Sequence, residues 1–158
     1  MNMFININNM VAGATQASSD ASPTHLVLYD GVCALCNGLL QFLLAHDRRG
    51  IYRFASLQSP TGKAIVTRFG GRPDELTSLY VVLDYRTERA RALTRSRAAI
   101  FILSTLGWPW TLARVIGVLP TVILDGLYDL VARSRYRIFG RYEQCLVPGP
   151  DIRDRFVD

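Results

Sequence analysis

The strongest constraint on the fold is a Cys-x-x-Cys motif at the point where an apolar strand runs into a helix. Apolar residues fill positions 26–29, and the pair Cys33 and Cys36 follows after a short connection. A helix that begins at or just before Cys33 places both sulfurs on one face of its first turn, close enough to form a disulfide. Backbone N–H groups and the helix dipole favour negative charge there, so we predict that Cys33 is a reactive thiolate.

The composition is that of a single domain in a reducing compartment. The chain has 158 residues, of which 49% are hydrophobic, enough to form a core without disulfides. Its three cysteines cannot all pair, and two of them lie together in the motif, which argues against a secreted disulfide scaffold. Residues 1–20 lack a positive region and a sustained apolar run, so they do not resemble a secretory signal. We predict a cytoplasmic protein whose domain spans residues 25–147, between a flexible N-terminal tail over 1–24 and a loose C-terminal tail over 148–158.

Alternating strand and helix patterns predict an α/β domain. Short apolar or alternating segments typical of strands lie at 26–29, 51–55, 78–83 and 90–94. Helical patterns that end in cap signals lie at 33–47, 59–69 and 96–106. The first two strands should be parallel neighbours joined by a crossover, and the last two should form an antiparallel hairpin. The order β-α-β-α-β-β-α therefore predicts a four-stranded mixed sheet.

Two further helices are predicted after this core, over 111–118 and 121–134. Residues 98–124 contain one charge, Arg114, so a membrane span has to be considered. Four residues divide this stretch into pieces too short to span a bilayer: Gly107, Pro109, Gly117 and Pro120. We therefore predict helices packed beside the sheet and no membrane span.

Arginines dominate the charge of the chain. The chain has 18 basic and 13 acidic residues, which gives a net charge of +5, and 17 of the basic residues are arginines. The densest group consists of Arg133, Arg135, Arg137 and Arg141. No nucleic-acid motif or platform of interleaved aromatic residues accompanies this group, so we predict a solvated basic face and no nucleic-acid partner.

The Cys-x-x-Cys spacing is compatible with three interpretations. A structural zinc site normally needs four Cys or His ligands in two spaced pairs, whereas the remaining candidates, Cys145, His25 and His46, are scattered. Cysteines can also be buried simply as small hydrophobic residues. The position between a strand and a helix of a βαβ unit instead favours a thioredoxin-like redox motif, without a metal or an organic cofactor. We expect Cys145 to be a packed spectator thiol, with a third redox partner as the alternative.

The redox interpretation assigns a role to each residue of the motif. Cys33, nearer the helix start and the surface, should attack a substrate disulfide and form a mixed disulfide. Cys36, a turn deeper, should then attack the Cys33 sulfur after losing a proton in an apolar setting. Asp30, at the end of the strand, is the candidate proton acceptor for this step. The alternative is that Asp30 only makes an Asx-type turn with Gly31 or caps the helix.

The segment from Leu28 to Asn37, which contains Asp30, Cys33 and Cys36, resembles the signature of the DCC family of thiol-disulfide oxidoreductases. Later segments look like further blocks of this family: 47–50, 53–59, 95–98, 125–129 and 135–140. The resemblance extends over residues 26–147. It implies a thioredoxin-like core, and it assigns the aspartate and the two cysteines that name the family to the three residues of the motif.

We therefore predict a thioredoxin-like core with additional C-terminal helices that catalyses thiol-disulfide exchange. Its partners would be a disulfide-containing protein or small molecule and an external thiol reductant. Two alternatives stay open. One is a thioredoxin-like binding module, in which the Arg-rich region with Trp108 and Trp110 docks a partner and the cysteines have no redox role. The other is a small zinc-binding structural protein.

Overall fold

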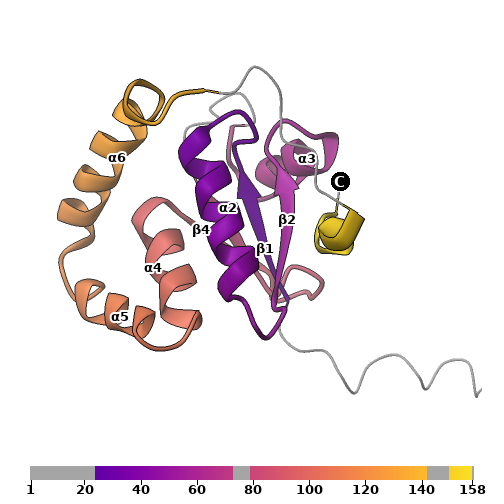
Figure 1. Ribbon diagram of the computed structural model, residues 1–158, viewed down its shortest axis with the longest axis horizontal. Coiled ribbons are helices and arrows are strands. Elements are labelled where there is room, and N and C mark those ends of the chain that lie inside the picture. The colour runs from indigo at the N-terminus through magenta and orange to yellow at the C-terminus, as the bar shows by residue number, and fades with distance from the viewer. Residues whose placement is uncertain (1–23, 73–78, 142–149, 158) are drawn as a thin grey trace, which may run out of the picture.

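Strand β1 and helix α2 form the part of the fold that carries the Cys-x-x-Cys motif (Figure 1). The computed structural model describes residues 24–72, 79–141 and 150–157; nearly all of the predicted N-terminal tail lies outside these ranges. β1 spans His25–Tyr29, and all five of its residues are buried, as expected for a strand covered on both faces. α2 spans Ala34–His46, with Cys33 as its N-cap. The predicted helix therefore differs from the observed one by one residue at each end.

Strand β2 lies parallel to β1 and is joined to it through α2. β2 spans Tyr52–Ser56, and its register places Phe54 beside Val27. Helix α3, Pro60–Arg68, follows, and the Ser59 side chain caps it by accepting a backbone N–H at 3.0 Å. A strand, a helix and a parallel strand in this order make the crossover that the sequence predicts.

The other half of the sheet is an antiparallel hairpin. β3 spans Tyr80–Leu83 and β4 spans Arg91–Thr94. β3 also pairs antiparallel with β1, with Val81 opposite Val27, so that the strand order is β2-β1-β3-β4. Helix α4, Arg95–Thr105, follows β4 directly. The prediction of an α/β fold with a four-stranded mixed sheet and a thioredoxin-like core is confirmed.

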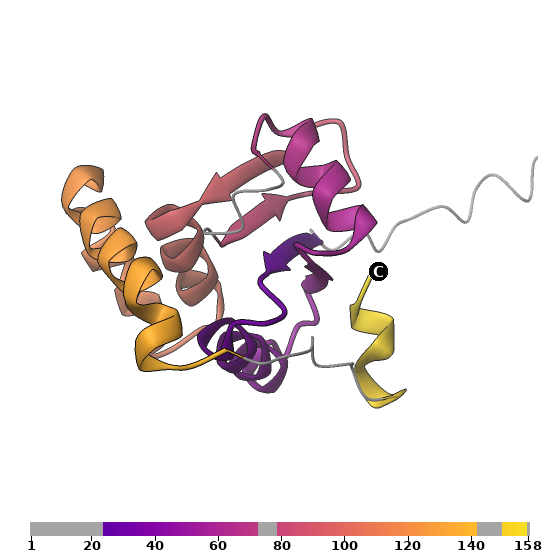
Figure 2. The same cartoon turned by 90° about the horizontal axis from the view of Figure 1, so that it is seen from above.

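Helices cover both faces of the sheet (Figure 2). Side chains alternate along each strand, so β1 contributes to two separate core clusters. The cluster under α2 and α4 includes Val27, Tyr29, Leu43, Ala98 and Ile102. The cluster under α3 includes Leu26, Leu28, Ala55 and Val66. The sheet is therefore the central layer, and the motif begins where β1 leaves it.

The C-terminal helices pack beside α4. They are the 3-10 helix η1 (Trp110–Leu112), α5 (Ala113–Ile116) and α6 (Thr121–Ile138). α5 is shorter than predicted, and α6 continues beyond its predicted end. Figures 1 and 2 show α4 between α6 and the sheet. Within the described ranges, no helix is long and apolar enough to cross a membrane.

Residues 150–157, part of the segment predicted as a loose tail, pack against β2. They contain the 3-10 helix η2, Pro150–Arg155. Arg155 donates from Nε to Tyr52 O at 2.9 Å and forms an ion pair with Asp47. The expectation of a loose tail is wrong for these residues, because the partners lie more than 100 residues earlier and local composition cannot reveal them.

Replacing Arg155 by Gln should lower the free energy of unfolding by about 1–3 kcal/mol. The Asp47 carboxylate, 3% exposed, would lose its cation and keep the backbone N–H groups of Ile51 and Tyr52 at 3.2 and 3.0 Å. Urea denaturation measures the change, with Arg153→Gln at an exposed position of η2 as the matched control. An equal loss of stability in both variants would contradict this assignment.

Candidate active site

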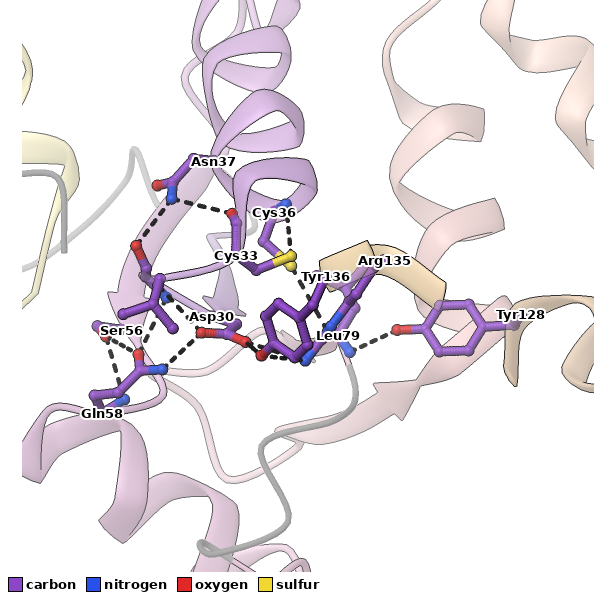
Figure 3. Close-up of polar contacts among 12 residues, drawn as sticks. Asp30, Cys33, Cys36, Asn37, Ser56, Gln58, Leu79, Tyr128, Arg135 and Tyr136 are labelled. Carbon is purple, nitrogen blue, oxygen red and sulfur yellow. Dashed lines mark hydrogen bonds and ion pairs between the residues drawn. The ribbon is translucent and has the colours of Figure 1, made fainter. Parts of the chain in front are cut away.

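The two cysteines lie at the first turn of α2 with their sulfurs on one side (Figure 3). Cys33 is the N-cap residue, and its Sγ accepts a hydrogen bond from the backbone N–H of Cys36, 3.4 Å away. Both are free thiols. The predicted proximity of the two cysteines at the start of a helix is confirmed.

The order of burial within the pair is the reverse of the prediction. Cys33 is 0% exposed, whereas Cys36 is partly exposed. The chain after α6 covers Cys33: Arg141 forms an isolated antiparallel bridge with it, and Ala34 N donates to Gly140 O at 3.4 Å. Gly140 has φ +85°, a left-handed conformation that suits glycine and ends the helix. The expectation that Cys33 lies nearer the surface is wrong, because a segment from the far end of the chain closes over it.

Asp30 follows β1 and is almost completely buried, with 1% of its surface exposed. Its Oδ1 accepts hydrogen bonds from the Val32 backbone N–H at 3.2 Å and from Gln58 Nε2 at 2.7 Å. Its Oδ2 accepts hydrogen bonds from Arg135 Nη2 at 3.0 Å and from the Tyr136 hydroxyl. The hydrogen bond from the Val32 N–H to the Asp30 side chain closes an Asx-type turn around Gly31, which is the alternative role that the sequence suggests for Asp30. The other three bonds come from distant segments of the chain.

Arg135 connects this carboxylate to the dithiol. Its side chain is 4% exposed; Nη2 binds Asp30, and Nη1 lies 3.9 Å from Cys36 Sγ. Nη2 also donates to the Tyr136 hydroxyl at 2.9 Å, and the guanidinium lies 4.7 Å from the centre of the Tyr136 ring. A buried guanidinium is tolerated here because an opposite charge and a hydroxyl accept its hydrogens.

The predicted solvated basic face is correct for three arginines of the group and wrong for Arg135. The three exposed members are Arg133, Arg137 and Arg141. The sequence contains a signal for the difference, because Leu124, Tyr128 and Arg135 follow at i, i+4 and i+11, which is one face of a helix. An arginine in the stripe that faces the core must point inward.

Burial and two neighbouring charges set the protonation of Cys36. Three effects raise the pKa of the Cys36 thiol to about 12: burial, which is the largest, the hydrogen bond to Cys33 and the negative charge of Cys33. The charge of Arg135 acts in the opposite direction and lowers this pKa. At neutral pH, Cys36 is therefore protonated in the reduced protein. Burial also raises the pKa of the Tyr136 hydroxyl, as do the hydrogen bond and charge of Asp30. The hydroxyl therefore stays protonated and donates a hydrogen bond to Asp30.

Asn37 and Gln58 hold the loop between β1 and α2, although neither belongs to a chemical motif. Asn37, 2% exposed, donates from Nδ2 to Gly31 O at 2.9 Å and to Cys33 O at 3.1 Å. Gln58 Oε1 accepts from Gly31 N at 3.1 Å and from the Ser56 hydroxyl at 2.6 Å. Both residues lie in segments that resemble the DCC family, which is the signal that could have identified them.

The two histidines lie far from the cysteines. His25 begins β1, at the opposite end of the strand from Asp30, and His46 ends α2, at the opposite end of the helix from the motif. In the part of the chain that the structure describes, no three His, Cys, Asp or Glu side chains form a group that could hold a metal ion. Cys145 lies outside the described residues.

Replacing Arg135 by Gln should raise the pKa of the Cys36 thiol, because a cation that opposes the effect of burial is removed. The pH dependence of alkylation by iodoacetamide measures this pKa in variants that also carry Cys33→Ser and Cys145→Ser, so that one thiol reacts. Arg133→Gln, at an exposed position of the same helix, is the matched control and should leave the pKa unchanged.

Arg135→Gln also leaves a buried carboxylate without its cation, which is destabilising, so Arg135→Lys supplies a second test that retains the charge. Lysine should restore part of the lost effect. The same pKa for Cys36 with Arg, Lys and Gln at position 135 would contradict the electrostatic role.

Comparison with known proteins places these residues in a family. The family model of DCC1-like thiol-disulfide oxidoreductases matches residues 27–141. The chain is 35% identical over 140 residues to the uncharacterized protein YuxK of Bacillus subtilis. The alignment covers 89% of this chain and 98% of YuxK. It is also 38% identical over 121 residues to a chloroplastic DCC family protein of Arabidopsis thaliana. That alignment covers 76% of this chain and 67% of the plant protein. No solved structure gives a significant match. Since the matched residues include the whole motif and Arg135, the chain belongs to the DCC1-like thiol-disulfide oxidoreductase family, as the segment around its cysteines predicts.

Proposed function

We propose that this protein exchanges thiols and disulfides through Cys33 and Cys36, with a disulfide-containing protein or small molecule as substrate. Membership of the family supports the general activity. The observation that carries the assignment to this pair is the N-cap position of Cys33, whose Sγ accepts the Cys36 backbone N–H at 3.4 Å. A sulfur at that position accepts a backbone N–H and lies at the positive end of the helix dipole, which interacts favourably with negative charge on an attacking sulfur.

In the first step, Cys33 is the nucleophile. Its thiolate attacks one sulfur of the substrate disulfide, the substrate S–S bond breaks, and a mixed disulfide with Cys33 forms. The other substrate sulfur leaves as a thiolate and takes a proton from solvent. Because Gly140 and Arg141 cover Cys33 in the reduced protein, this segment has to move away from α2 before the substrate can reach the sulfur.

In the second step, Cys36 is the resolving thiol. It gives up its proton, attacks the Cys33 sulfur and releases the second substrate thiolate. The substrate has then gained two electrons, and Cys33 and Cys36 form a disulfide that an external thiol reductant returns to the dithiol. Burial of the sulfur opposes the loss of the Cys36 proton, although the negative charge of Cys33, which also raises this pKa in the dithiol, is absent in the mixed disulfide. The step therefore needs a proton acceptor and a cation beside the sulfur.

Asp30 and Arg135 meet these two needs. We assign Asp30 as the proton acceptor, and Arg135, 3.9 Å from the Cys36 sulfur, as the cation that stabilises the thiolate. Four donors surround the Asp30 carboxylate, so it can take up a proton only when one of them turns away. Tyr136 is the donor best placed to do so, because it is 37% exposed.

The alternative functions make different demands on the same chain. A binding module would use the basic region and the two tryptophans, of which Trp108 is exposed and Trp110 packs edge-on against Phe42 at 5.0 Å. A zinc-binding structural protein would use the cysteines as metal ligands.

A cytoplasmic location stays a prediction, and the plant relative is named as chloroplastic.

Replacing Cys36 by Ser should trap a mixed disulfide on Cys33, because serine cannot attack the Cys33 sulfur. Incubation with oxidised glutathione and intact mass spectrometry should show one glutathione per chain in Cys36→Ser and much less in Cys33→Ser. Both variants carry Cys145→Ser, so that the third cysteine cannot react. Equal adducts on both variants would contradict the assignment of the nucleophile. Inert thiols would instead support the binding module, and stoichiometric zinc in the purified protein would support the structural role.

Replacing Asp30 by Asn should slow resolution of the mixed disulfide by roughly 10²-fold or more, the usual contribution of a general base. Formation of the mixed disulfide, which does not use the carboxylate, should change much less. Rapid quenching separates the two steps. Asp154→Asn, the same substitution at an exposed position of η2, is the matched control and should leave both rates unchanged. Because Asp30→Asn also breaks a buried ion pair, the folded fraction is measured in the same samples. Resolution at the unmodified rate in folded Asp30→Asn would exclude the role of proton acceptor.

A further inference from the structure

The outer face of α6 carries large apolar side chains that are exposed. They are Val122, Ile123, Leu127, Leu130, Val131 and Ile138. Leu130, near the middle of this face, is 65% exposed. The apolar surface continues onto η1, α5 and the following turn, through Leu112, Val115, Ile116, Val118 and Leu119. A run of exposed apolar residues this long is typical of an interaction surface.

The charged residues on the outer face of α6 are positive. At about 100° per residue, Arg133 and Arg137 project on the same side of the helix as Val122, Ile123 and Leu130, and both are exposed. Asp125 lies toward α4 and contacts Ser96, whereas Asp129, one turn before Arg133, borders the outer face and pairs with Arg95 of α4 at 3.8 Å. Among the described residues of α6, Asp129 is therefore the carboxylate closest to the outer face, and Arg95 already neutralises it, so the face keeps a net positive charge from Arg133 and Arg137.

We propose that the outer face of α6 docks on the surface of a lipid bilayer that contains anionic headgroups, with the helix axis along the membrane plane. The apolar side chains would enter the boundary between headgroups and acyl chains, and Arg133 and Arg137 would pair with headgroup phosphates. Figures 1 and 2 show α6 along one side of the molecule with α4 behind it, so that its outer face is a convex edge. A convex edge fits a fluid bilayer surface, whereas a protein partner would have to supply a matching groove.

A second copy of this chain fits the outer face less well. A symmetric dimer packs the same patch against itself, so Arg133 and Arg137 of one copy would enter an apolar interface together with those of the other. The carboxylate of α6 nearest to Arg133, Asp129, already pairs with Arg95 at 3.8 Å, so the arginines would be buried without a partner of their own, which is strongly unfavourable. An anionic bilayer supplies the negative charge that the face lacks.

Docking in this way would bring the candidate active site next to the bilayer. The inner side of α6 carries Arg135, which contacts Asp30 and Cys36. The proposal rests on the outer face alone and does not depend on the redox function, so the two can fail separately.

Sedimentation with vesicles tests the proposal on the full chain. The protein should sediment with vesicles of phosphatidylcholine and phosphatidylserine and be released by salt, and it should bind phosphatidylcholine vesicles much less. Arg133→Gln with Arg137→Gln should lower the partition coefficient by roughly 30-fold. Leu127→Ser with Leu130→Ser should lower it by roughly tenfold or more.

The matched control is Arg68→Gln with Arg86→Gln, which removes the same charge from exposed positions on α3 and in the loop between β3 and β4. This control should bind anionic vesicles nearly as well as the unmodified chain, and thermal unfolding checks the fold of every variant. An equal loss in both arginine pairs, binding that does not depend on anionic lipid, or no binding would overturn the proposal. A dimer in sedimentation equilibrium that Leu127→Ser with Leu130→Ser dissociates would also overturn it, because a second copy would then occupy the face.

Discussion

The ion pair between Asp30 and Arg135 is the contact on which both the docking of the C-terminal helices and the candidate active site depend. The two side chains are 1% and 4% exposed, and their charged atoms lie 3.0 Å apart. Two charges in a protein interior are tolerated only when they are paired and hydrogen-bonded, and loss of one partner leaves the other as an unfavourable buried charge. The carboxylate at the end of β1 therefore requires α6 to dock with Arg135 facing inward.

This contact makes the surroundings of the two thiols depend on a helix outside the thioredoxin-like core. Docked α6 brings Arg135 to 3.9 Å from the Cys36 sulfur, where its charge opposes the burial that raises the Cys36 pKa. The chain that follows α6 covers Cys33 through Gly140 and Arg141. Gly140, with φ +85°, ends the helix and begins the covering segment, so the cover over Cys33 lies outside the helix that holds Arg135.

Local patterns were sufficient to predict the core, because the apolar period and the end signals of each element lie within its own segment. The helix predicted over 33–47 spans 34–46, and the motif that it carries was recognised from the same segment. Arg135 and the packed residues 150–157 were not predicted, because their partners lie more than 100 residues away. A local pattern can show that a residue faces inward, but it cannot show which distant group that residue will meet.

Helix α6 turns several polar side chains inward and leaves large apolar side chains exposed beside Arg133 and Arg137 on its outer face. The polar groups of its inner side each have a partner within the domain: Asp125, Tyr128 and Arg135. Leu127 and Leu130 are exposed, so packing within the domain does not explain them. Because the inner contacts and the outer face lie on different sides of α6, a surface can bind the outer face while Arg135 stays beside Asp30 and Cys36.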